Sequence, residues 1–341
     1  MANNSIKTEE CVKKVKEESN FNEVDVKAIN TIRVLSADMV QAANSGHPGA
    51  PMGCAPLAHV LFSRHLRCNP ANPKWINRDR FVLSNGHACA LQYSLLHLLG
   101  YDLSLSDLKN FRQLDSKTPG HPENHMTPGI EVTTGPLGQG FANAVGLAVA
   151  QAHLNARFNN TGLFDSHTFV LMGDGCMQEG IASEAASLAG HLKLGNLIVF
   201  YDDNKISIDG ETDISFTENV DERFKAYGFH CLSVENGDED LNAIDEAIRI
   251  AKTVQDRPTL IRVRTTIGKG SSIAGSEKAH GAPLGKDELA SVKRFFGFEP
   301  SESFVVPIEV AQLYAQVAAR GQAAEAAWNE KFNGSVRKES P

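Results

Sequence analysis

A carboxylate and a side-chain amide lie in two short motifs of this sequence, Gly173-Asp174-Gly175 and Asp202-Asp203-Asn204. Their oxygen atoms suit a hard cation such as Mg²⁺ or Ca²⁺ rather than zinc, and no Cys or His accompanies them at metal-ligand spacing. Mg²⁺ usually completes its coordination with water and phosphate oxygens, and the glycines beside Asp174 let a backbone approach phosphate closely. An isolated Gly-Asp-Gly is more often an ordinary turn, so a cation and diphosphate site depends on where Asn204 lies.

The elements predicted around these motifs bring them to one edge of a sheet. Residues 168–172 and 196–201 are short β-rich runs, and residues 179–192 carry apolar side chains at helical intervals. A helix of about 14 residues is roughly 21 Å long, and a strand of about six residues returns roughly 20 Å. We therefore predict a βαβ unit with Asp174 and Asn204 at the carboxyl edge, where open α/β sheets bind ligands.

Two further helices are predicted next to histidines. Residues 24–43 form an amphipathic helix that ends just before His47, so this histidine is expected on a loop. Ser84 or Asn85 is expected to cap a second helix, which puts His87 in its first turn. A helix N-terminus attracts phosphate, so His87 would be well placed for a diphosphate oxygen.

The remaining pattern completes an α/β fold. Residues 141–158 are predicted to form an apolar helix and residues 259–264 an alternating strand. Alternation of strands and helices favours a doubly wound, mostly parallel sheet flanked by helices. No linker rich in Pro, Gly or Ser interrupts it, so we expect one large domain over residues 24–320, after a polar extension at 1–23 and before a connecting segment at 321–341.

Five segments of the chain resemble the transketolases. Gly173 to Gly180 and Asp202 to Gly210 together resemble the thiamin diphosphate signature in the form that this family uses. Four other segments resemble the family in the same order along the chain, at residues 45–53, 83–88, 118–123 with 133–140, and 278–285. The resemblance covers about residues 24–297 and weakens after Phe298, and it implies the thiamin diphosphate-binding fold.

Four of the twelve histidines differ from the others because Gly or Pro flanks them in predicted loops or helix starts. The others are expected to be ordinary core or surface residues. The resemblance implies that the four surround the reactive carbon of the cofactor, bind oxygens of the donor sugar and help to move protons; they are His47, His87, His121 and His280. Imidazoles can supply such donors near neutral pH to an oxygen that becomes an alkoxide.

The resemblance also implies roles for other positions. Asp174, Asn204 and the backbone oxygen of Ile206 would hold the metal ion. Glu179 matches a glutamate of the family's dimer interface beside the cofactor, although it could instead be a helix N-terminal carboxylate. Cofactor contacts are implied for His87, Gly135, Leu137, Gly175, Glu179, Asn204, Ile208, Ile267 and His280, of which Ile208 and Ile267 could simply be core.

The activity that the resemblance implies is ketol transfer in the pentose phosphate pathway. A two-carbon unit would pass from a ketose phosphate to an aldose phosphate through thiamin diphosphate, with Mg²⁺ or Ca²⁺. A transketolase is about twice as long, and its second domain supplies the glutamate that activates the aminopyrimidine. Neither this domain nor the third is matched here. We therefore expect the chain to bind the cofactor weakly alone and to be nearly inactive without a complementary domain or the second subunit of a homodimer.

Two alternatives to this reading stay open. One is half of a dihydroxyacetone synthase-like ketol transferase, because the choice of acceptor depends partly on the half that is not matched. The other is a non-catalytic binding or regulatory module that retains the fold. The complete set of four histidines with Asp174 and Asn204 favours the enzyme.

Composition argues against several other classes of protein. The chain has 42% hydrophobic and 22% charged residues, and its net charge of −8 gives no general electrostatic reason to bind nucleic acid. No apolar run approaches the length that spans a membrane. Six cysteines are scattered without a Cys-x-x-Cys pair, and the polar N-terminus resembles neither a signal nor a transit peptide, so a cytoplasmic location is expected.

Overall fold

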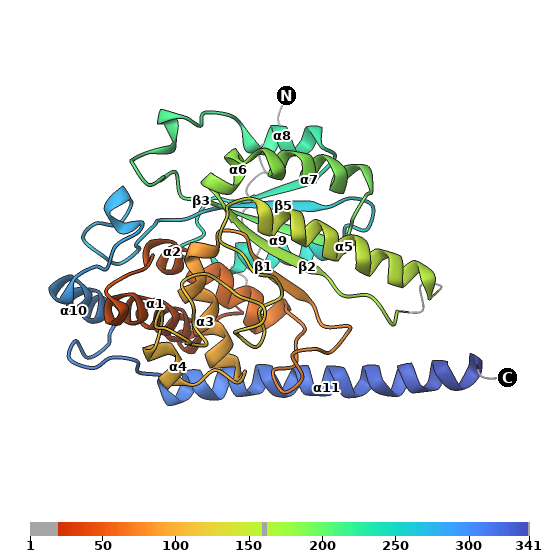
Figure 1. The fold of residues 1–341 in the computed structure, drawn as a ribbon, viewed down its shortest axis with the longest axis horizontal. Helices are drawn as coiled ribbons and strands as arrows, with labels where there is room; N and C mark the ends of the chain where they lie inside the picture. The colour runs from red at the N-terminus through yellow and green to blue at the C-terminus, as the bar shows by residue number, and fades with distance from the viewer. Residues whose placement is uncertain (1–19, 159–161, 340–341) are drawn as a thin grey trace, which may run out of the picture.

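The computed structural model describes residues 20–158 and 162–339, which form an α/β fold (Figure 1). Within them, one sheet has five parallel strands in the order β1-β2-β3-β5-β4. The strands are β1 (Arg80–Leu83), β2 (Thr168–Gly173), β3 (Leu197–Asp203), β4 (His230–Val234) and β5 (Thr259–Arg264). The predicted fold class is therefore confirmed.

Helices pack on both faces of the sheet, as expected for parallel strands that are buried on both sides. Alternate strand residues point to opposite faces, so Val170 and Val199 lie in one apolar cluster and Phe169 and Phe200 in the other. The first cluster contains residues of α5 (Gln139–Arg157), α6 (Asp174–Gln178), α7 (Gly180–His191) and α8 (Val220–Ala226). The second contains residues of α1 (Glu23–Ala43), α2 (Gly49–Val60), α3 (Cys89–Leu99), α9 (Leu241–Thr253) and α11 (Ile308–Glu339).

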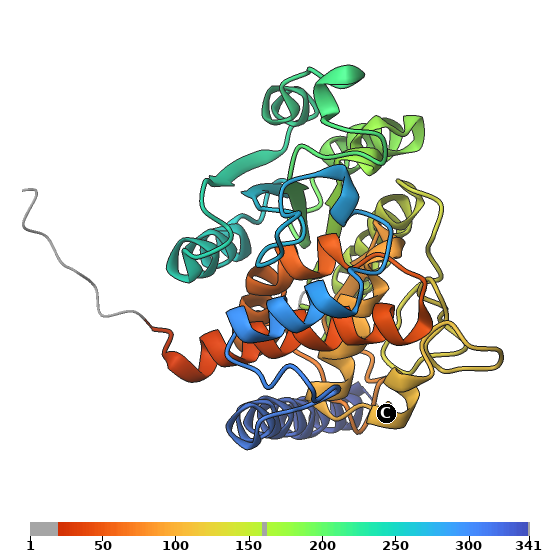
Figure 2. The same ribbon diagram turned by 90° about the vertical axis from the view of Figure 1, so that its left-hand side faces the viewer.

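Helices α1, α10 and α11 form the outer part of the second face. Figure 2 shows α10 (Lys286–Phe295) lying along α1, with α11 viewed nearly along its axis below them. A buried ion pair joins α10 to α1, with 2.7 Å between Nζ of Lys293 and Oδ1 of Asp38. α11 runs without a break across residue 320, so the proposed domain boundary there stays a prediction. Most of the predicted polar extension, residues 1–19, lies outside the described residues.

The predicted βαβ unit is confirmed at the level of strand pairing. β2 and β3 are parallel neighbours, and their register places Gly173 opposite Asp202. The two motifs therefore end side by side at the carboxyl edge of the sheet. β3 continues to Asp203, two residues beyond the predicted end, because the strand still pairs with β5 there.

The helix predicted over residues 179–192 is confirmed as α7, whose N-cap is Glu179 and whose C-cap is Leu192. Residues 174–178 form the separate short helix α6, and α7 begins only at Gly180. Glu179 lies between them in extended backbone, as the N-cap of α7, without a side-chain capping bond.

The predicted cap at Ser84 or Asn85 was wrong. Residues Gly86–Ala88 form a 3₁₀ turn, and α3 begins only at Cys89. The hydroxyl of Ser84 instead accepts a hydrogen bond from the backbone N–H of Phe141 at 3.1 Å, in the first turn of α5. The hydroxyl oxygen of Ser84, which the sequence pattern predicted as a helix cap, therefore makes a tertiary contact. His87 lies in the 3₁₀ turn.

Among the described residues, no helix has both the length and the apolar character needed to cross a membrane.

Candidate active site

A cavity of about 310 Å³ lies at the carboxyl ends of β2 and β3. Of the predicted site residues, all but Glu179 line it; they are His47, His87, His121, Gly135, Leu137, Asp174, Gly175, Asn204, Ile206, Ile208, Ile267 and His280. Glu179 is exposed and lies beside Gly138, where an added Cβ would be 2.7 Å from the Cβ of Glu179. The structure thus brings together residues that are spread over most of the chain.

Two isoleucines of the set differ in burial. Ile208 is 72% exposed, so the alternative that it belongs to the core is wrong. Ile267 is buried and packs with Ile206 and Ala279, so it belongs to a small apolar cluster as well as to the cavity wall.

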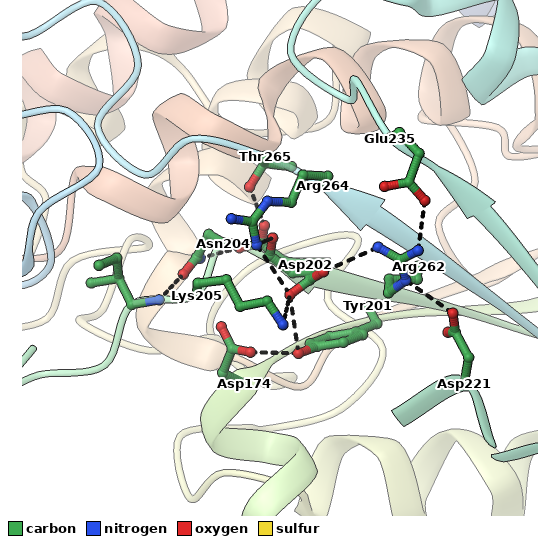
Figure 3. Close-up of polar contacts among 12 residues, drawn as sticks. Asp174, Tyr201, Asp202, Asn204, Lys205, Asp221, Glu235, Arg262, Arg264 and Thr265 are labelled. Atoms are coloured by element: carbon green, nitrogen blue, oxygen red, sulfur yellow. Dashed lines mark hydrogen bonds and ion pairs between the residues drawn. The ribbon is translucent and has the colours of Figure 1, made fainter. Parts of the chain in front are cut away.

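One end of the cavity, here called the metal corner, consists of Asp174, Tyr201, Asp202 and Asn204 (Figure 3). The hydroxyl of Tyr201 donates a hydrogen bond to Oδ1 of Asp174 at 2.5 Å. The other oxygen of Asp174, Oδ2, is buried without a hydrogen-bond partner. Burial, together with the nearby charges of Asp202 and Asp203, raises the pKa of Asp174 to about 7, although the bond from Tyr201 opposes this shift.

The amide of Asn204 is fixed from both sides. Its Nδ2 donates to Oδ2 of Asp202 at 2.8 Å, and its Oδ1 accepts from the backbone N–H of Ile206 at 2.9 Å. Asp202 in turn accepts a hydrogen bond from the hydroxyl of Thr265. Burial, with the neighbouring charge of Asp203, raises the pKa of Asp202 to about 6.

The positive side chains near the metal corner surround Asp203 instead. Lys205 and Arg262 lie 3.2 Å from its carboxylate, and Arg264 lies 3.4 Å from it (Figure 3). Within the described part of the chain, neither Asp174 nor Asp202 forms an ion pair with Lys or Arg. The two carboxyl groups that line the cavity are therefore left without a cationic side-chain partner.

These residues fit a hard divalent cation. Oδ2 of Asp174 is an unpartnered buried oxygen, and an amide oxygen and a backbone carbonyl of the same cavity wall complete an oxygen-only donor set. In residues 20–158 and 162–339, no group of three or more His, Cys, Asp or Glu side chains is arranged to hold a metal ion.

The other part of the cavity, here called the histidine cluster, consists of His47, His87, His121 and His280. The ring centroids of His47 and His87 are 5.1 Å apart, those of His87 and His280 are 5.1 Å apart, and those of His47 and His280 are 5.5 Å apart. His121 lies beside Gly135, where an added Cβ would be 3.5 Å from its ring. Four histidines from distant segments therefore share one wall of the cavity.

Close backbone contacts at two glycines bring the segments of the histidine cluster together. A Cβ on Gly49, two residues after His47, would lie 2.3 Å from the backbone oxygen of Ala279. A Cβ on Gly86, next to His87, would lie 2.9 Å from the backbone nitrogen of Gly135. Any larger residue at either position would push its histidine away from the partner segment.

All four histidines of the cluster have pKa values below the ordinary value, and burial is the largest cause of the shift in each. Burial, with the charges that His280, Arg112 and His121 can carry, lowers the pKa of His47 to about 4. The histidine cluster is therefore uncharged near neutral pH.

Arg112 is a residue of the site that sequence reasoning missed. Its guanidinium donates to the hydroxyl of Ser45 at 3.0 Å and to the carbonyl of Gly120 at 3.3 Å, and it lies 3.5 Å from Nδ1 of His47. Because a guanidinium only donates, this contact needs Nδ1 without a proton and leaves the proton on Nε2. Arg112 has a left-handed φ of 60°, which no local pattern in the sequence indicated.

Comparison with known proteins identifies the family of the chain. Residues 24–341 match the family model described as "Transketolase, thiamine diphosphate binding domain". The chain belongs to the transketolase family. The predicted family is therefore confirmed, and thiamin diphosphate is the cofactor that the family model names. The match also extends through residues 298–341, so the limit that the motifs set near Phe298 was wrong.

Transketolases of known sequence and structure match this chain over about one half of their own length. The chain is 60% identical to transketolase 1 of Saccharomyces cerevisiae over 323 residues, which cover 94% of this chain and 47% of that protein. A transketolase of Pichia stipitis solved in complex with sedoheptulose 7-phosphate superposes with a TM-score of 0.92 and 57% identity, over 93% of this chain and 47% of that chain. A transketolase of Leishmania mexicana gives a TM-score of 0.92 with 50% identity, over 94% of this chain and 48% of that chain. The chain thus spans about half the length of these relatives.

Proposed function

We propose that this chain is the diphosphate- and metal-binding half of a transketolase, which transfers a two-carbon ketol unit from a ketose phosphate to an aldose phosphate. The observation that carries the proposal is a single cavity that holds both an unpartnered buried carboxylate oxygen and a cluster of uncharged histidines. The relative from Pichia stipitis that was solved with sedoheptulose 7-phosphate supports sugar phosphates as substrates.

In this proposal the metal corner anchors the cofactor. Asp174, Asn204 and the backbone oxygen of Ile206 hold Mg²⁺ or Ca²⁺, whose charge balances both the diphosphate and the buried carboxylate. Gly175 lets the backbone approach the diphosphate, which His87 and His280 also contact. Thiamin diphosphate, when bound, supplies a carbon nucleophile and an electron sink for the carbon–carbon bond that is broken.

The apolar wall positions the rings of the cofactor. Gly135 and Leu137 pack against the aminopyrimidine, and Ile208 and Ile267 pack against the thiazolium. The high exposure of Ile208 supports this assignment, because a large apolar side chain on a cavity wall gains free energy when a ligand covers it.

The histidine cluster acts on the sugar. An uncharged imidazole donates from one ring nitrogen and accepts at the other, so it can bind a hydroxyl and also move a proton. Donors around the carbonyl oxygen of the ketose stabilise it as it gains negative charge. Arg112 fixes His47 with Nδ1 as an acceptor, and this leaves the N–H at Nε2 as the donor.

We extend the proposal to a homodimer in the cytoplasm, with the diphosphate-binding domain over residues 24–320 and a connecting segment from 321. Ile181 and Leu188 of α7 and its C-cap residue Leu192 are exposed, and this apolar strip follows directly after Glu179. A strip of this kind suits burial against a second subunit, with Glu179 in the interface beside the cofactor.

Isothermal titration calorimetry tests the proposed function. The chain is titrated with thiamin diphosphate in the presence of Mg²⁺, alone and mixed with the complementary second half of a transketolase relative. We expect weak binding alone, binding at least about tenfold tighter in the mixture, and ketol transfer from a ketose phosphate only in the mixture. We expect tighter binding in the mixture because residues of both halves then contact the cofactor.

Three other results would point elsewhere. Absence of metal-dependent binding in both samples would contradict the proposal. Tight binding without turnover in the mixture would favour a non-catalytic module. Transfer to formaldehyde in preference to an aldose phosphate would favour a dihydroxyacetone synthase-like enzyme.

A further inference from the structure

Lys205 lies between two of the proposed metal ligands and has its backbone in the left-handed region. Its φ is 63°, a conformation that costs free energy in any residue with a Cβ and that glycine adopts most readily. Asn204 precedes it and Ile206 follows it, and both line the cavity at the carboxyl end of β3. Strained backbone directly between two functional groups indicates that the strain serves the site.

The chain after Lys205 is held in a short antiparallel bridge. Ile206 lies opposite Glu211 in this bridge. The N–H of Thr212 donates to the carbonyl of Lys205 at 3.0 Å, and the N–H of Ser207 donates to a carbonyl across the turn at 2.7 Å. These bonds do not use the carbonyl of Ile206, which therefore stays available to a cation.

The groups on either side of Lys205 are fixed as well. The side chain of Ile206 is buried and packs with Ile267, and its N–H donates to Oδ1 of Asn204 at 2.9 Å. An amide oxygen has two lone pairs, so Oδ1 of Asn204 keeps one for a cation. Nδ2 of Asn204 is held by Asp202 at 2.8 Å. The direction of the Ile206 carbonyl relative to the Asn204 amide therefore depends mainly on the backbone of Lys205.

The side chain of Lys205 contributes less than its backbone. Nζ lies 3.2 Å from Oδ1 of Asp203, a carboxylate that Arg262 also contacts (Figure 3). The side chain of Lys205 is 52% exposed, and ion pairs with such an exposed partner contribute little free energy. The site therefore depends on the backbone conformation at this position more than on the ion pair.

We propose that Lys205 is a positioning residue for the metal: its left-handed backbone directs the amide oxygen of Asn204 and the carbonyl oxygen of Ile206 toward the same cation. The inference rests on the proposed function, which assigns the metal to these two residues and Asp174. A residue that cannot keep a left-handed backbone turns the carbonyl away from the ion. Glycine keeps this conformation best, and a β-branched residue keeps it least well.

The affinity for Mn²⁺ tests the inference without any need for turnover. Free Mn²⁺ is followed by electron paramagnetic resonance as it is titrated into the full 341-residue chain with thiamin diphosphate. Lys205→Val and Lys205→Gly both remove the ion pair with Asp203, so the difference between them reports the backbone. In Lys205→Val we expect the dissociation constant of Mn²⁺ to rise about tenfold or more, which is the usual effect of losing a partner of a metal ligand. In Lys205→Gly it should stay within about twofold of the unmodified chain, because glycine adopts the left-handed backbone without strain.

Lys193→Val is the matched control. Lys193 is an exposed lysine with a left-handed φ of 53°, in the turn between α7 and the start of β3. It therefore lies at the amino edge of the sheet, away from the cavity. This variant introduces the same kind of strain, so its urea midpoint should fall about as far as that of Lys205→Val. Its dissociation constant for Mn²⁺ should stay unchanged.

A milder variant keeps the test valid where Lys205→Val does not fold. Alanine also lacks the ion pair, and it keeps a left-handed backbone less well than glycine but better than valine. Lys205→Ala should therefore bind Mn²⁺ more weakly than Lys205→Gly.

The outcomes separate this inference from the proposed function. No Mn²⁺ binding by the unmodified chain with thiamin diphosphate would overturn the proposed metal site and this inference with it. Normal binding by the unmodified chain, with equal affinities in the glycine, alanine and valine variants of Lys205, would leave the site standing and overturn the role of the backbone. An equal loss of affinity in Lys193→Val would show that strain anywhere in the fold weakens the site, which also overturns a positioning role for Lys205.

Discussion

The metal corner and the histidine cluster share one cavity but are built in different ways. Asp174 and Asn204 come from one βαβ unit, in which the parallel register of β2 and β3 sets their motifs side by side. His47, His87 and His280 come from distant segments that meet through backbone contacts. Burial raises the pKa values of the carboxyl groups Asp174 and Asp202 in the metal corner, whereas it lowers the pKa values of the histidine cluster. The metal ligands proposed here can thus be positioned by one local unit, while the groups proposed to act on the sugar need the whole tertiary fold.

The largest expected effect is the loss of cofactor affinity when the metal corner is mutated. Asp174→Ala removes the open carboxylate oxygen, so metal-dependent binding of thiamin diphosphate should weaken more than about 100-fold, beyond the usual effect of losing a partner of a metal ligand. Calorimetry with Mg²⁺ measures the change. With the metal removed by a chelator, the variant and the unmodified chain should bind the cofactor equally weakly. Asp256→Asn, at a fully exposed carboxylate, is the control, and a similar loss there would contradict this role for Asp174.

A smaller effect is expected when the histidine cluster is disturbed without any change of charge. Gly49→Ala forces a Cβ to within 2.3 Å of the backbone oxygen of Ala279, so we expect the free energy of unfolding to fall by about 1–3 kcal/mol. Urea unfolding measures this loss, and the Mn²⁺ affinity of the metal corner should stay close to normal. Gly146→Ala in α5 meets no atom within 4 Å and should instead stabilise the chain by about 0.5–1 kcal/mol. A chain that tolerates both changes equally would show that the contact at Gly49 does not hold the cluster together.

The pH dependence of stability should report the histidine cluster. The pKa of His47 is about 4 in the folded chain and near 6.5 when unfolded, so between these values the unfolded chain binds a proton that the folded chain does not. The contribution of His47 is therefore constant above about pH 6.5 and becomes unfavourable as pH falls toward 4. Urea midpoints over this range should fall less steeply in His47→Gln than in the unmodified chain. An equal slope in both chains, or a similar effect of His125→Gln at an exposed site, would count against this assignment.

The smallest expected effect concerns Arg112. Arg112→Gln removes a positive charge beside His47, so the pKa of His47 should rise from about 4 but stay below its ordinary value, because burial is the larger cause. Titration of the imidazole Cε1 proton by nuclear magnetic resonance measures the shift. Arg257→Gln, at an exposed arginine, should cause none. A fall in the pKa of His47 on loss of Arg112 would show that the guanidinium does not act through its charge.

The difference between the two regions also explains what the sequence could predict. The spacing of Asp174 and Asn204 defines a βαβ unit, whose geometry follows from strand and helix lengths, and the structure confirms that pairing. The histidine cluster was predicted only through family resemblance, because no local pattern shows that Gly49 touches the segment before His280.

The residues that sequence reasoning missed act through tertiary contacts. In the sequence, Tyr201 is the last residue of a predicted apolar strand. Its hydroxyl contacts Asp174 only because β3 pairs with β2. Arg112 lies in a loop with left-handed backbone, a conformation that its sequence neighbours do not indicate. The cap predicted at Ser84 was wrong for the same reason, a tertiary contact: a backbone N–H of α5 donates to its hydroxyl.

Anomalous scattering from Mn²⁺, in crystals of the chain grown with thiamin diphosphate, locates the ion directly. We predict a peak within coordination distance of Oδ2 of Asp174 and of the side chain of Asn204, with the histidine cluster facing the reactive end of the cofactor. A peak in the neighbouring polar pocket lined by Glu211 and Asp238, or bound cofactor without a peak at Asp174, would contradict the assignment of the metal corner.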